Sequence, residues 1–221
     1  MKTALIIGAT GLVGSHLVDL LLEDNCFGKV KIFSRRKTGK SGSKLEEHII
    51  NFDTPEQWQH LVKGDILFST LGTTIKKAGS KEAQYKIDYT YQFNFAEAAA
   101  KNGVSTYVLV SSAGASPDSN IFYSRMKGEL EIAVQQLLFQ YIRIIQPGIL
   151  KGNRQEFRLG EKIGIAALNI LHYIPGLNKY RPIPAATVAQ AMINACWDRT
   201  KHIQTYSLEK VFELAKQIKR D

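Results

Sequence analysis

The chain has 221 residues, of which 44% are hydrophobic and 22% charged. This balance supports one packed domain and excludes disordered and fibrous classes. The 29 Lys and Arg against 20 Asp and Glu give a formal net charge of +9. That charge favours an anionic ligand, a nucleic acid or an acidic membrane surface without choosing among them. The two cysteines, Cys26 and Cys196, cannot build a disulfide framework and suit a reducing compartment.

Export and membrane signals are not evident. The apolar N-terminal run is interrupted by glycines and Asp19, unlike the core of a secretory signal peptide. The uncharged run 163–178 contains His172 and Pro175 and is too short for a spanning helix. We therefore expect a cytoplasmic protein that does not bind membranes.

Short β-branched runs alternate with longer helical patterns, which is typical of a parallel sheet with crossover helices. Strands are expected at 3–7, 30–33, 48–51, 66–69, 106–110 and 141–145, and helices at 12–23, 55–62, 80–101 and 123–140. The sequence therefore predicts an α/β fold with a doubly wound parallel sheet, in a single domain over 1–221.

The regular alternation of strand-like and helix-like segments ends after Pro147 and Gly148. Helical patterns follow at 159–171, 187–197 and 208–219, with a possible short strand at 203–207. We expect residues 149–221 to form a small helical lobe over the carboxyl ends of the strands, where a substrate or a partner would bind.

A glycine-rich turn joins the first expected strand to the first expected helix. Gly8, Gly11 and Gly14 allow a tight turn close to a pyrophosphate, and the following helix N-terminus offers N–H groups to its charge. Ligands of open α/β sheets bind at this edge. The turn therefore predicts a nucleotide site, although Ala9 stands where the Gly-x-Gly-x-x-Gly pattern has a glycine.

The second expected strand ends in Ser34-Arg35-Arg36-Lys37, without the acid that an NAD-binding site places there for the ribose 2′-hydroxyl. Between Lys29 and Lys44 there are seven Lys or Arg and no acid. A guanidinium can bind a 2′-phosphate, which a carboxylate would repel. The run favours NADP over NAD, and a merely solvated basic loop is the alternative.

Hydroxyl groups and a Tyr-x-x-x-Lys pair follow the fifth expected strand. Ser111 and Ser112 come directly after it, and Tyr123 and Lys127 share one face of the next helix. An ammonium group about 4 Å from a phenol favours the phenolate by about 4 kcal/mol at an effective dielectric constant of about 20. Tyr123 would exchange a proton with a carbonyl or alcohol oxygen, which Ser112 would hold, while Lys127 could also bind the nicotinamide ribose.

A second Tyr-x-x-x-Lys copy, Tyr206 to Lys210, is interpreted as ordinary surface near the last helix. The first copy stands out because it follows both the glycine turn and the serine-bearing strand. Either Ser111 or Ser112 could be the catalytic serine, and we favour Ser112.

Together these residues resemble the short-chain dehydrogenase/reductase superfamily in its atypical branch. More closely, the chain is similar to the Tat-interacting-protein-like oxidoreductases and their bacterial relatives. The matching segments are Gly8–Gly11, Ser34–Lys37, Leu71–Thr74, Lys77–Gly79, Val110–Ser112, Ser119–Glu129, Pro147–Gly148 and Arg154–Glu156.

This resemblance implies a Rossmann domain that binds NADP(H), with Ser112, Tyr123 and Lys127 as the catalytic residues. It implies contacts to the pyrophosphate from the glycine turn, to the 2′-phosphate from Arg35 and Arg36, and to the ribose from Leu71 and Gly72. The full set of cofactor-binding residues would be Gly8, Thr10, Gly11, Leu12, Val13, Gly14, Arg35, Arg36, Leu71, Gly72, Tyr123, Lys127, Ile149 and Arg158.

We therefore expect an NADPH-dependent oxidoreductase that acts on a small carbonyl compound or alcohol. The alternative is an NADPH-binding regulator that presents its C-terminal lobe to a protein partner. A nucleotide-sugar epimerase is less favoured because the tail looks small for a sugar-nucleotide lobe. The helical patterns at 80–101 and 123–140 could pair in a homodimer, or their apolar faces could be internal.

Two further classes are not expected. Nucleic-acid binding lacks a visible stacking platform, because Phe33 is the one aromatic residue in the basic run. A metal site is not expected because the five histidines are dispersed without ligand-like spacing. They are His16, His48, His60, His172 and His202.

Overall fold

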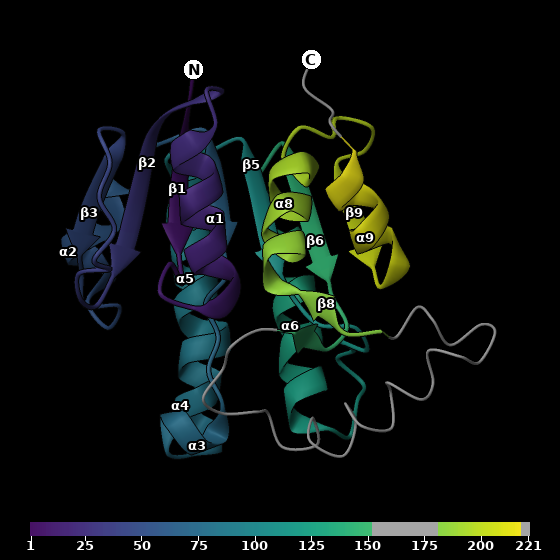
Figure 1. The fold of residues 1–221 in the computed structure, drawn as a ribbon. Helices are drawn as coiled ribbons and strands as arrows, with labels where there is room; N and C mark the ends of the chain where they lie inside the picture. The colour runs from purple at the N-terminus through teal and green to yellow at the C-terminus, as the bar shows by residue number, and fades with distance from the viewer. Residues whose placement is uncertain (152–180, 218–221) are drawn as a thin grey trace.

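Seven parallel strands form one sheet in the computed structural model, which describes residues 1–151 and 181–217 (Figure 1). The strands are β1 (Lys2–Ile7), β2 (Phe27–Ser34), β3 (Leu45–Ile49), β4 (Ile66–Ser69), β5 (Thr106–Val110), β6 (Tyr141–Gln146) and β9 (Ile203–Ser207). Their order is β3-β2-β1-β4-β5-β6-β9, and every neighbouring pair is parallel. The predicted doubly wound α/β sheet is confirmed, and β9 adds a seventh strand beside β6.

The strand order reverses between β1 and β4. The chain first builds outward from β1 to β3 and then returns to β4 on the other side of β1. At such a switch point the loops after two neighbouring strands diverge, which opens a crevice at the carboxyl ends. The candidate site is therefore expected above β1 and β4.

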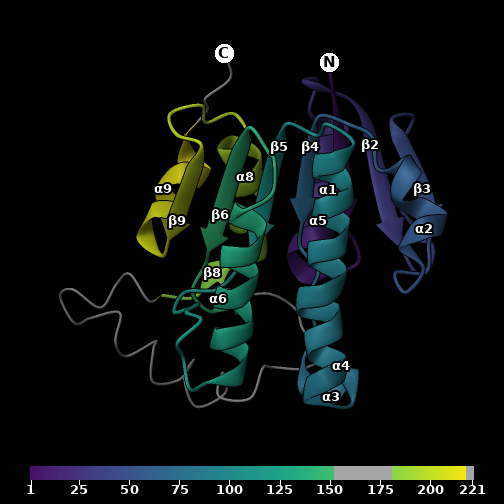
Figure 2. The same cartoon turned by 180° about the vertical axis from the view of Figure 1, so that it is seen from behind.

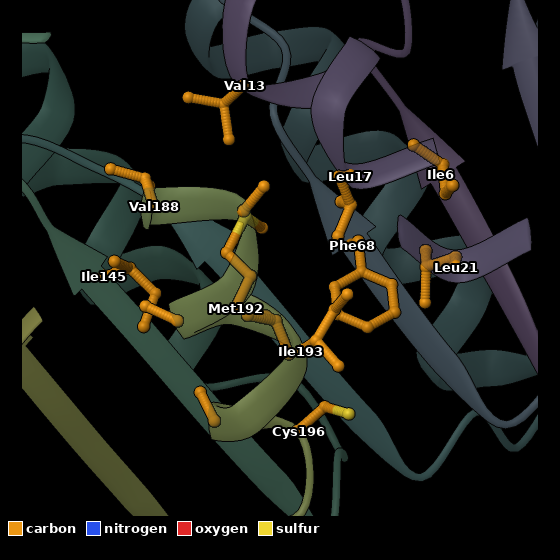
Figure 3. Close-up of a cluster of buried hydrophobic side chains, with 14 of the residues drawn as sticks. Ile6, Val13, Leu17, Leu21, Phe68, Ile145, Val188, Met192, Ile193 and Cys196 are labelled. Atoms are coloured by element: carbon orange, nitrogen blue, oxygen red, sulfur yellow. The ribbon is translucent and has the colours of Figure 1, made fainter. Parts of the chain in front are cut away.

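Helices cover both faces of the sheet, which is why the central strands are apolar on both sides. The helices α1 (Leu12–Glu23), α8 (Ala185–Ala195) and α9 (Glu209–Lys216) cover one face (Figure 1). In that core Leu17 of α1 and Met192 of α8 pack around Phe68 of β4 (Figure 3).

The opposite face carries α5 (Tyr91–Lys101) and α6 (Phe122–Gln135), which stand side by side in Figure 2. The short helix α2 (Pro55–Trp58) and the 3-10 turn η1 (Gln59–Leu61) replace the expected helix 55–62. Trp58 of α2 stacks on Phe95 of α5, with ring centroids 5.1 Å apart.

The expected helix 80–101 consists of three segments in succession. It begins with α4 (Lys81–Tyr85), continues through the π-helical turn η2 (Lys86–Thr90) and ends with α5. The Ser80 hydroxyl caps α4 by accepting from the Ala83 N–H at 3.1 Å. A preceding single-turn helix, α3 (Ile75–Ala78), is capped in the same way by Thr74.

The C-terminal segment is closely joined to the sheet in its described part. α8 is almost entirely buried and packs beside α1 on the sheet face, and β9 pairs with β6. We expected these elements over the strand ends, but the apolar surface of α8 is buried against the sheet instead. The short strands β7 (Leu150–Lys151) and β8 (Ile183–Pro184) pair with each other. The helical pattern at 159–171 and Arg158 lie outside the described residues.

The part of the chain that the structure describes contains neither a membrane-spanning helix nor a metal-binding cluster. No helix there is both long and apolar enough to cross a bilayer. Nor does that part of the chain contain a group of three or more His, Cys, Asp or Glu side chains arranged to hold a metal ion.

Candidate active site

A cavity of about 500 Å³ opens at the carboxyl ends of the strands, at the switch point. The loops after β1, β4, β5, β6 and β9 all contribute to it, together with α6. Its walls are formed by Gly11, Leu12, Val13, Thr70, Leu71, Gly72, Val110, Ser111, Ser112, Ala113, Gly114, Tyr123, Lys127, Pro147, Gly148, Ile149, Leu150 and Leu208. The structure thus brings most of the predicted site residues into one space.

The glycine turn after β1 is packed too tightly for side chains. Gly8 has a φ of +86°, and a Cβ there would lie 2.5 Å from the backbone nitrogen of Leu71. A Cβ on Gly14 would lie 2.2 Å from the Gly8 carbonyl oxygen. Gly8 and Gly14 therefore shape the turn from beneath, whereas Gly11, Leu12 and Val13 line the cavity.

The N-terminus of α1 points its first N–H groups into this region. Gly11 is the N-cap, no side chain caps the helix, and its first turn has no acid. The first N–H groups of a helix have no partner within the helix, and the helix dipole adds partial positive charge there. These groups can bind an anion, and a phosphate is the usual one.

The opposite wall, after β4, is held by buried polar side chains behind it. Asp88 in η2 is fully buried and its carboxylate accepts from the Thr73 N–H at 2.7 Å. Gln84 of α4 donates to the Thr73 carbonyl at 3.1 Å. Because Thr73 follows Leu71 and Gly72 directly, this clamp fixes the two residues that line the cavity.

A second hollow of about 360 Å³ is lined by Thr10, Ser34, Arg35 and Arg36. It joins the glycine turn to the end of β2, as expected for the two sequence signals. The Ser34 hydroxyl donates to the Arg36 carbonyl at 2.6 Å, which holds the backbone of this loop. The hollow is polar and cationic, and it suits a phosphate group.

The seven cations of the basic run fall into two groups. Four are engaged: Lys29 and Lys31 pair with Glu46, Lys40 pairs with Asp19, and Lys44 donates to the Asp24 carbonyl. Arg35, Arg36 and Lys37 are exposed and make no ion pair with any residue that the structure describes. Two of these three cations, Arg35 and Arg36, line the second hollow.

Tyr123 and Lys127 both line the main cavity from α6. Lys127 is only 3% exposed, so its ammonium lies in a region of low dielectric, where charge acts more strongly than in water. Gly128 allows α6 to come this close to the serine loop, since a Cβ there would lie 2.3 Å from the carbonyl carbon of Ser116. Sequence reasoning did not give Gly128 this function.

Both candidate serines line the cavity, in different surroundings. Ser111 is buried, and its hydroxyl makes no hydrogen bond with any residue that the structure describes. Ser112 is partly exposed, and its hydroxyl makes a long contact of 3.4 Å to the Ala113 carbonyl. The Ser112 hydroxyl is the more available of the two, so Ser112 stays our prediction for the catalytic serine.

The second Tyr-x-x-x-Lys copy is divided between two elements. Tyr206 belongs to β9 and its hydroxyl donates to Asp198, while Lys210 lies in α9. Burial and the neighbouring Asp198 raise the pKa of the Tyr206 phenol. Tyr206 is thus half-buried rather than ordinary surface, and neither residue lines the cavity.

Sequence reasoning missed several lining residues. Thr70 could have been found, because it directly follows a buried strand at the carboxyl edge. Leu208 had no visible signal: it has a φ of +50°, and its N–H donates to the Gln146 carbonyl at 3.1 Å. That strained conformation follows from the β6–β9 pairing, which composition does not reveal.

Comparison with known proteins gives a family and a group of relatives. A family model described as "NAD(P)H-binding" matches residues 8–163. The chain is 34% identical to "Protein FMP52, mitochondrial" of Coccidioides immitis, over 97% of this chain and 94% of the relative. It is 33% identical to "Protein FMP52-1, mitochondrial" of Scheffersomyces stipitis, over 98% of this chain and 100% of the relative. These relatives are fungal, whereas the sequence resemblance suggested bacterial ones.

Solved structures share the fold at low sequence identity. The Bordetella bronchiseptica enzyme WbmH in complex with NAD+ gives a TM-score of 0.69 at 19% identity, over 94% of this chain and 75% of that chain. A short-chain dehydrogenase/reductase superfamily protein from Agrobacterium tumefaciens with bound NAD gives 0.67 at 16% identity, over 93% and 77%. These similarities support the Rossmann-type fold alone.

The relatives contradict the cytoplasmic location that we expected. Both fungal proteins are named mitochondrial, so that prediction is wrong. It rested on the lack of a secretory signal and of a spanning helix, and on two free cysteines. None of these features separates one reducing compartment of a cell from another.

Proposed function

This chain belongs to the NAD(P)H-binding family, and from that premise we propose that it is an oxidoreductase that uses NADP(H) to interconvert a small carbonyl compound and its alcohol. One observation carries the proposal: the N-terminal residues of α1 and the pair Tyr123 and Lys127 line the same cavity. Nucleotide binding alone would need only the first of these two features.

The residues around the glycine turn fit a dinucleotide. The close packing of Gly8 and Gly14 leaves the backbone of Gly11 to Val13 accessible from the cavity. The first N–H groups of α1 would bind the pyrophosphate, because they are uncapped and lie at the positive end of the helix dipole. Leu71 and Gly72 on the facing wall would contact the ribose.

The charge distribution favours NADPH over NADH. Arg35 and Arg36 line a hollow next to Thr10 and have no acid partner among the described residues. A guanidinium binds phosphate through paired, charge-assisted hydrogen bonds. Lys29, Lys31 and Lys40 of the same run already have carboxylate partners, so we assign the 2′-phosphate to the two arginines.

The side chains on α6 would handle the proton. In the reductive direction, Tyr123 would donate its hydroxyl proton to the carbonyl oxygen while bound NADPH supplies the hydride to the carbonyl carbon. The buried Lys127 ammonium would stabilise the phenolate that remains. Ser112 would donate a hydrogen bond to the same substrate oxygen and so orient it for the transfer.

Two measurements test this proposal. NADPH and NADH are titrated against the protein by fluorescence, and a panel of aldehydes, ketones and quinones is then screened for loss of NADPH absorbance. We expect tighter binding of NADPH and turnover of at least one carbonyl compound. Failure to bind either nucleotide would overturn the proposal.

Tyr123→Phe separates catalysis from nucleotide sensing. The variant should bind NADPH like the wild type but lose about 100-fold or more in turnover, the usual contribution of a positioned proton donor. Unchanged turnover in the variant would contradict the assigned chemistry and favour an NADPH-binding regulator.

A further inference from the structure

One residue of the cavity lining has an unusual backbone conformation. Leu208 joins β9 to α9 and has a φ of +50° and a ψ of −113°. These angles are close to those of the first central residue of a type II′ turn, where glycine is the usual residue. Leu208 is the one residue other than glycine with a positive φ in the part of the chain that the structure describes. A bulky residue in this region is a conformational outlier.

Hydrogen bonds on both sides of Leu208 hold this conformation. Its N–H donates to the Gln146 carbonyl at 3.1 Å, and its own carbonyl accepts from the Val211 N–H at 3.1 Å. The hydroxyl of the preceding Ser207 donates to the Gln146 side-chain oxygen at 2.5 Å. Gln146 is fixed in turn, because its amide nitrogen donates to both carboxylate oxygens of Glu131 at 2.9 Å. A strained residue persists where the surrounding structure over-determines it, as these bonds do here.

The side chain of Leu208 bounds the cavity at the end remote from the glycine turn. Its Cδ2 lies against the loop after β6, where a Cβ on Gly148 would be 3.5 Å from it. The strand β9 is the edge of the sheet, with β5 and β6 between it and the switch point (Figure 1). A dinucleotide that binds at the N-terminus of α1 therefore leaves Leu208 facing the substrate end of the cavity.

The lining around Leu208 is apolar. The chain after β6 adds three apolar side chains to the cavity wall: Pro147, Ile149 and Leu150. Among the described residues of the lining, Lys127 is the one charged side chain, and the proposed function already uses it on α6. A charged group on a substrate would lose its water among these apolar side chains without a partner of its own, which is costly.

We propose that the substrate is an uncharged, apolar carbonyl compound and that Leu208 limits its size. The inference rests on the proposed function, because it assumes that the cavity holds NADPH and the carbonyl compound together. The hydrogen-bonded turn makes Leu208 a firm boundary, since its backbone cannot shift without breaking several bonds. Leu208 contributes shape alone, and the proton transfer stays with Tyr123.

Four ketones test the substrate class. Acetophenone and benzophenone are neutral and differ in bulk, whereas para-acetylbenzoate and para-isopropylacetophenone are similar in shape and differ in charge. The value of kcat/KM for each is measured from the loss of NADPH absorbance. We expect the wild type to reduce acetophenone about 10-fold better than benzophenone, and para-isopropylacetophenone about 10-fold better than para-acetylbenzoate.

Leu208→Ala and Leu208→Gly test the size limit. Both remove the bounding side chain, so each should raise the ratio of kcat/KM for benzophenone to that for acetophenone by about 10-fold. NADPH affinity should stay within about twofold, because Leu208 lies away from the glycine turn. Leu208→Gly also relieves the positive φ, so it should unfold about 2 °C or more above Leu208→Ala.

Ile203→Ala is the matched control. Ile203 is the first residue of the same strand, is half-buried and lies outside the cavity lining. The control loses an apolar side chain from β9, which lowers the unfolding temperature, but the ratio of the two ketones should stay within about twofold.

The contrary outcomes are distinct. If both Leu208 variants leave the ratio unchanged, or if Ile203→Ala shifts it as much, Leu208 does not limit substrate size. If the wild type reduces para-acetylbenzoate as well as para-isopropylacetophenone, or reduces none of the neutral ketones, the substrate class is overturned, whereas turnover of another carbonyl compound leaves the proposed function standing. A wild-type chain that does not bind NADPH overturns the proposed function, and this inference with it.

Discussion

The two halves of the cavity are lined by different kinds of chemical group. The half that follows β1 and β4 is lined by glycines, backbone and short apolar or hydroxyl side chains, from Gly11 to Val13 and from Thr70 to Gly72. The half that follows β5, β6 and β9 contains Tyr123 and the buried cation Lys127. A backbone-made surface suits a ligand whose charge is fixed, such as a pyrophosphate. A surface that contains titratable side chains suits proton transfer.

The two halves should therefore tolerate different kinds of substitution. The first half depends on the absence of side chains at two glycines, whereas the second depends on the presence of a few polar groups. Substitutions that add one methyl group should damage the first half most. Substitutions that remove one hydroxyl or one charge should damage the second.

Gly14→Ala should have the largest effect. Its new Cβ would lie 2.2 Å from the Gly8 carbonyl oxygen, and overpacking of this kind costs about 3 kcal/mol of unfolding free energy or more. The control is Gly148→Ala in the other half, where a Cβ would meet nothing nearer than 3.5 Å and the change should stay within about 1 kcal/mol. Urea unfolding measures the unfolding free energy of both variants. Equal losses in the two would contradict the difference between the two halves of the cavity.

Ser112→Ala should lower turnover of the carbonyl compound found in the screen by about 100-fold, the usual cost of losing a hydrogen-bond donor to the reacting oxygen. NADPH affinity should be unchanged. Ser111→Ala is the comparison, and its loss should be smaller because Ser111 is the more deeply buried of the two serines. The reverse order of the two losses would identify Ser111 as the donor.

Arg35→Ser combined with Arg36→Ser should weaken NADPH binding about 10-fold, because charge-assisted hydrogen bonds to the 2′-phosphate are lost. Binding of NADH, which lacks that phosphate, should change little. Lys40→Ser is the control, since the Lys40 ammonium is already paired with Asp19 at 2.6 Å. If the double variant loses as much affinity for NADH as for NADPH, the arginines do not bind the 2′-phosphate.

The smallest expected effect is a change in how stability depends on pH. Glu131 of α6 is nearly buried, and its carboxylate accepts from the Gln146 side-chain amide at 2.9 Å. Burial raises the native-state pKa of this carboxyl above its ordinary value of 4.5, against the opposing effects of Gln146 and Lys127. The native state therefore holds this proton more tightly than the unfolded state. Its contribution to stability is fully present below the unfolded-state pKa and is lost as pH rises through the native-state value.

The Glu131→Gln variant lacks this titrating carboxyl. Its unfolding temperature should therefore rise relative to that of the wild type as pH rises from about 4 to about 7. Parallel curves for the two proteins would contradict the raised native-state pKa. Glu129→Gln serves as the reference, because this less buried acid of the same helix accepts from the Tyr85 hydroxyl and lies beside Arg125 instead.

Much of the fold could be predicted from the sequence because its signals are local. Five of the six expected strands lie within observed ones, since buried β-branched runs have few other conformations available between helices. The strand expected at 48–51 is shifted to β3, Leu45–Ile49, whose residues are partly or fully exposed and so give a weaker signal. The position of β9 could not be predicted, because all five of its residues are half-exposed and nothing in such a run identifies its neighbour. The same limit applies to α8, whose apolar residues fit a lobe or a sheet face equally well.

The candidate site divides in the same way. The glycine turn and the pair Tyr123 and Lys127 were found because each motif lies within a few residues at a strand end. Leu208 and the hydrogen bonds of Glu131 were missed, because Glu131 on α6 meets Gln146 of β6, and Gln146 in turn meets Ser207 of β9.

Local sequence patterns set the backbone: where strands and helices form, and where the chain can turn only through glycine. The arrangement of five loops and one helix face around the cavity comes from the tertiary fold, as do the hydrogen bonds that join one buried acid of α6 to the end of β6, and the end of β6 to that of β9. The physical reason is that periodicity and backbone conformation are set by neighbouring residues, whereas the order of strands in a sheet is set by packing across the whole domain.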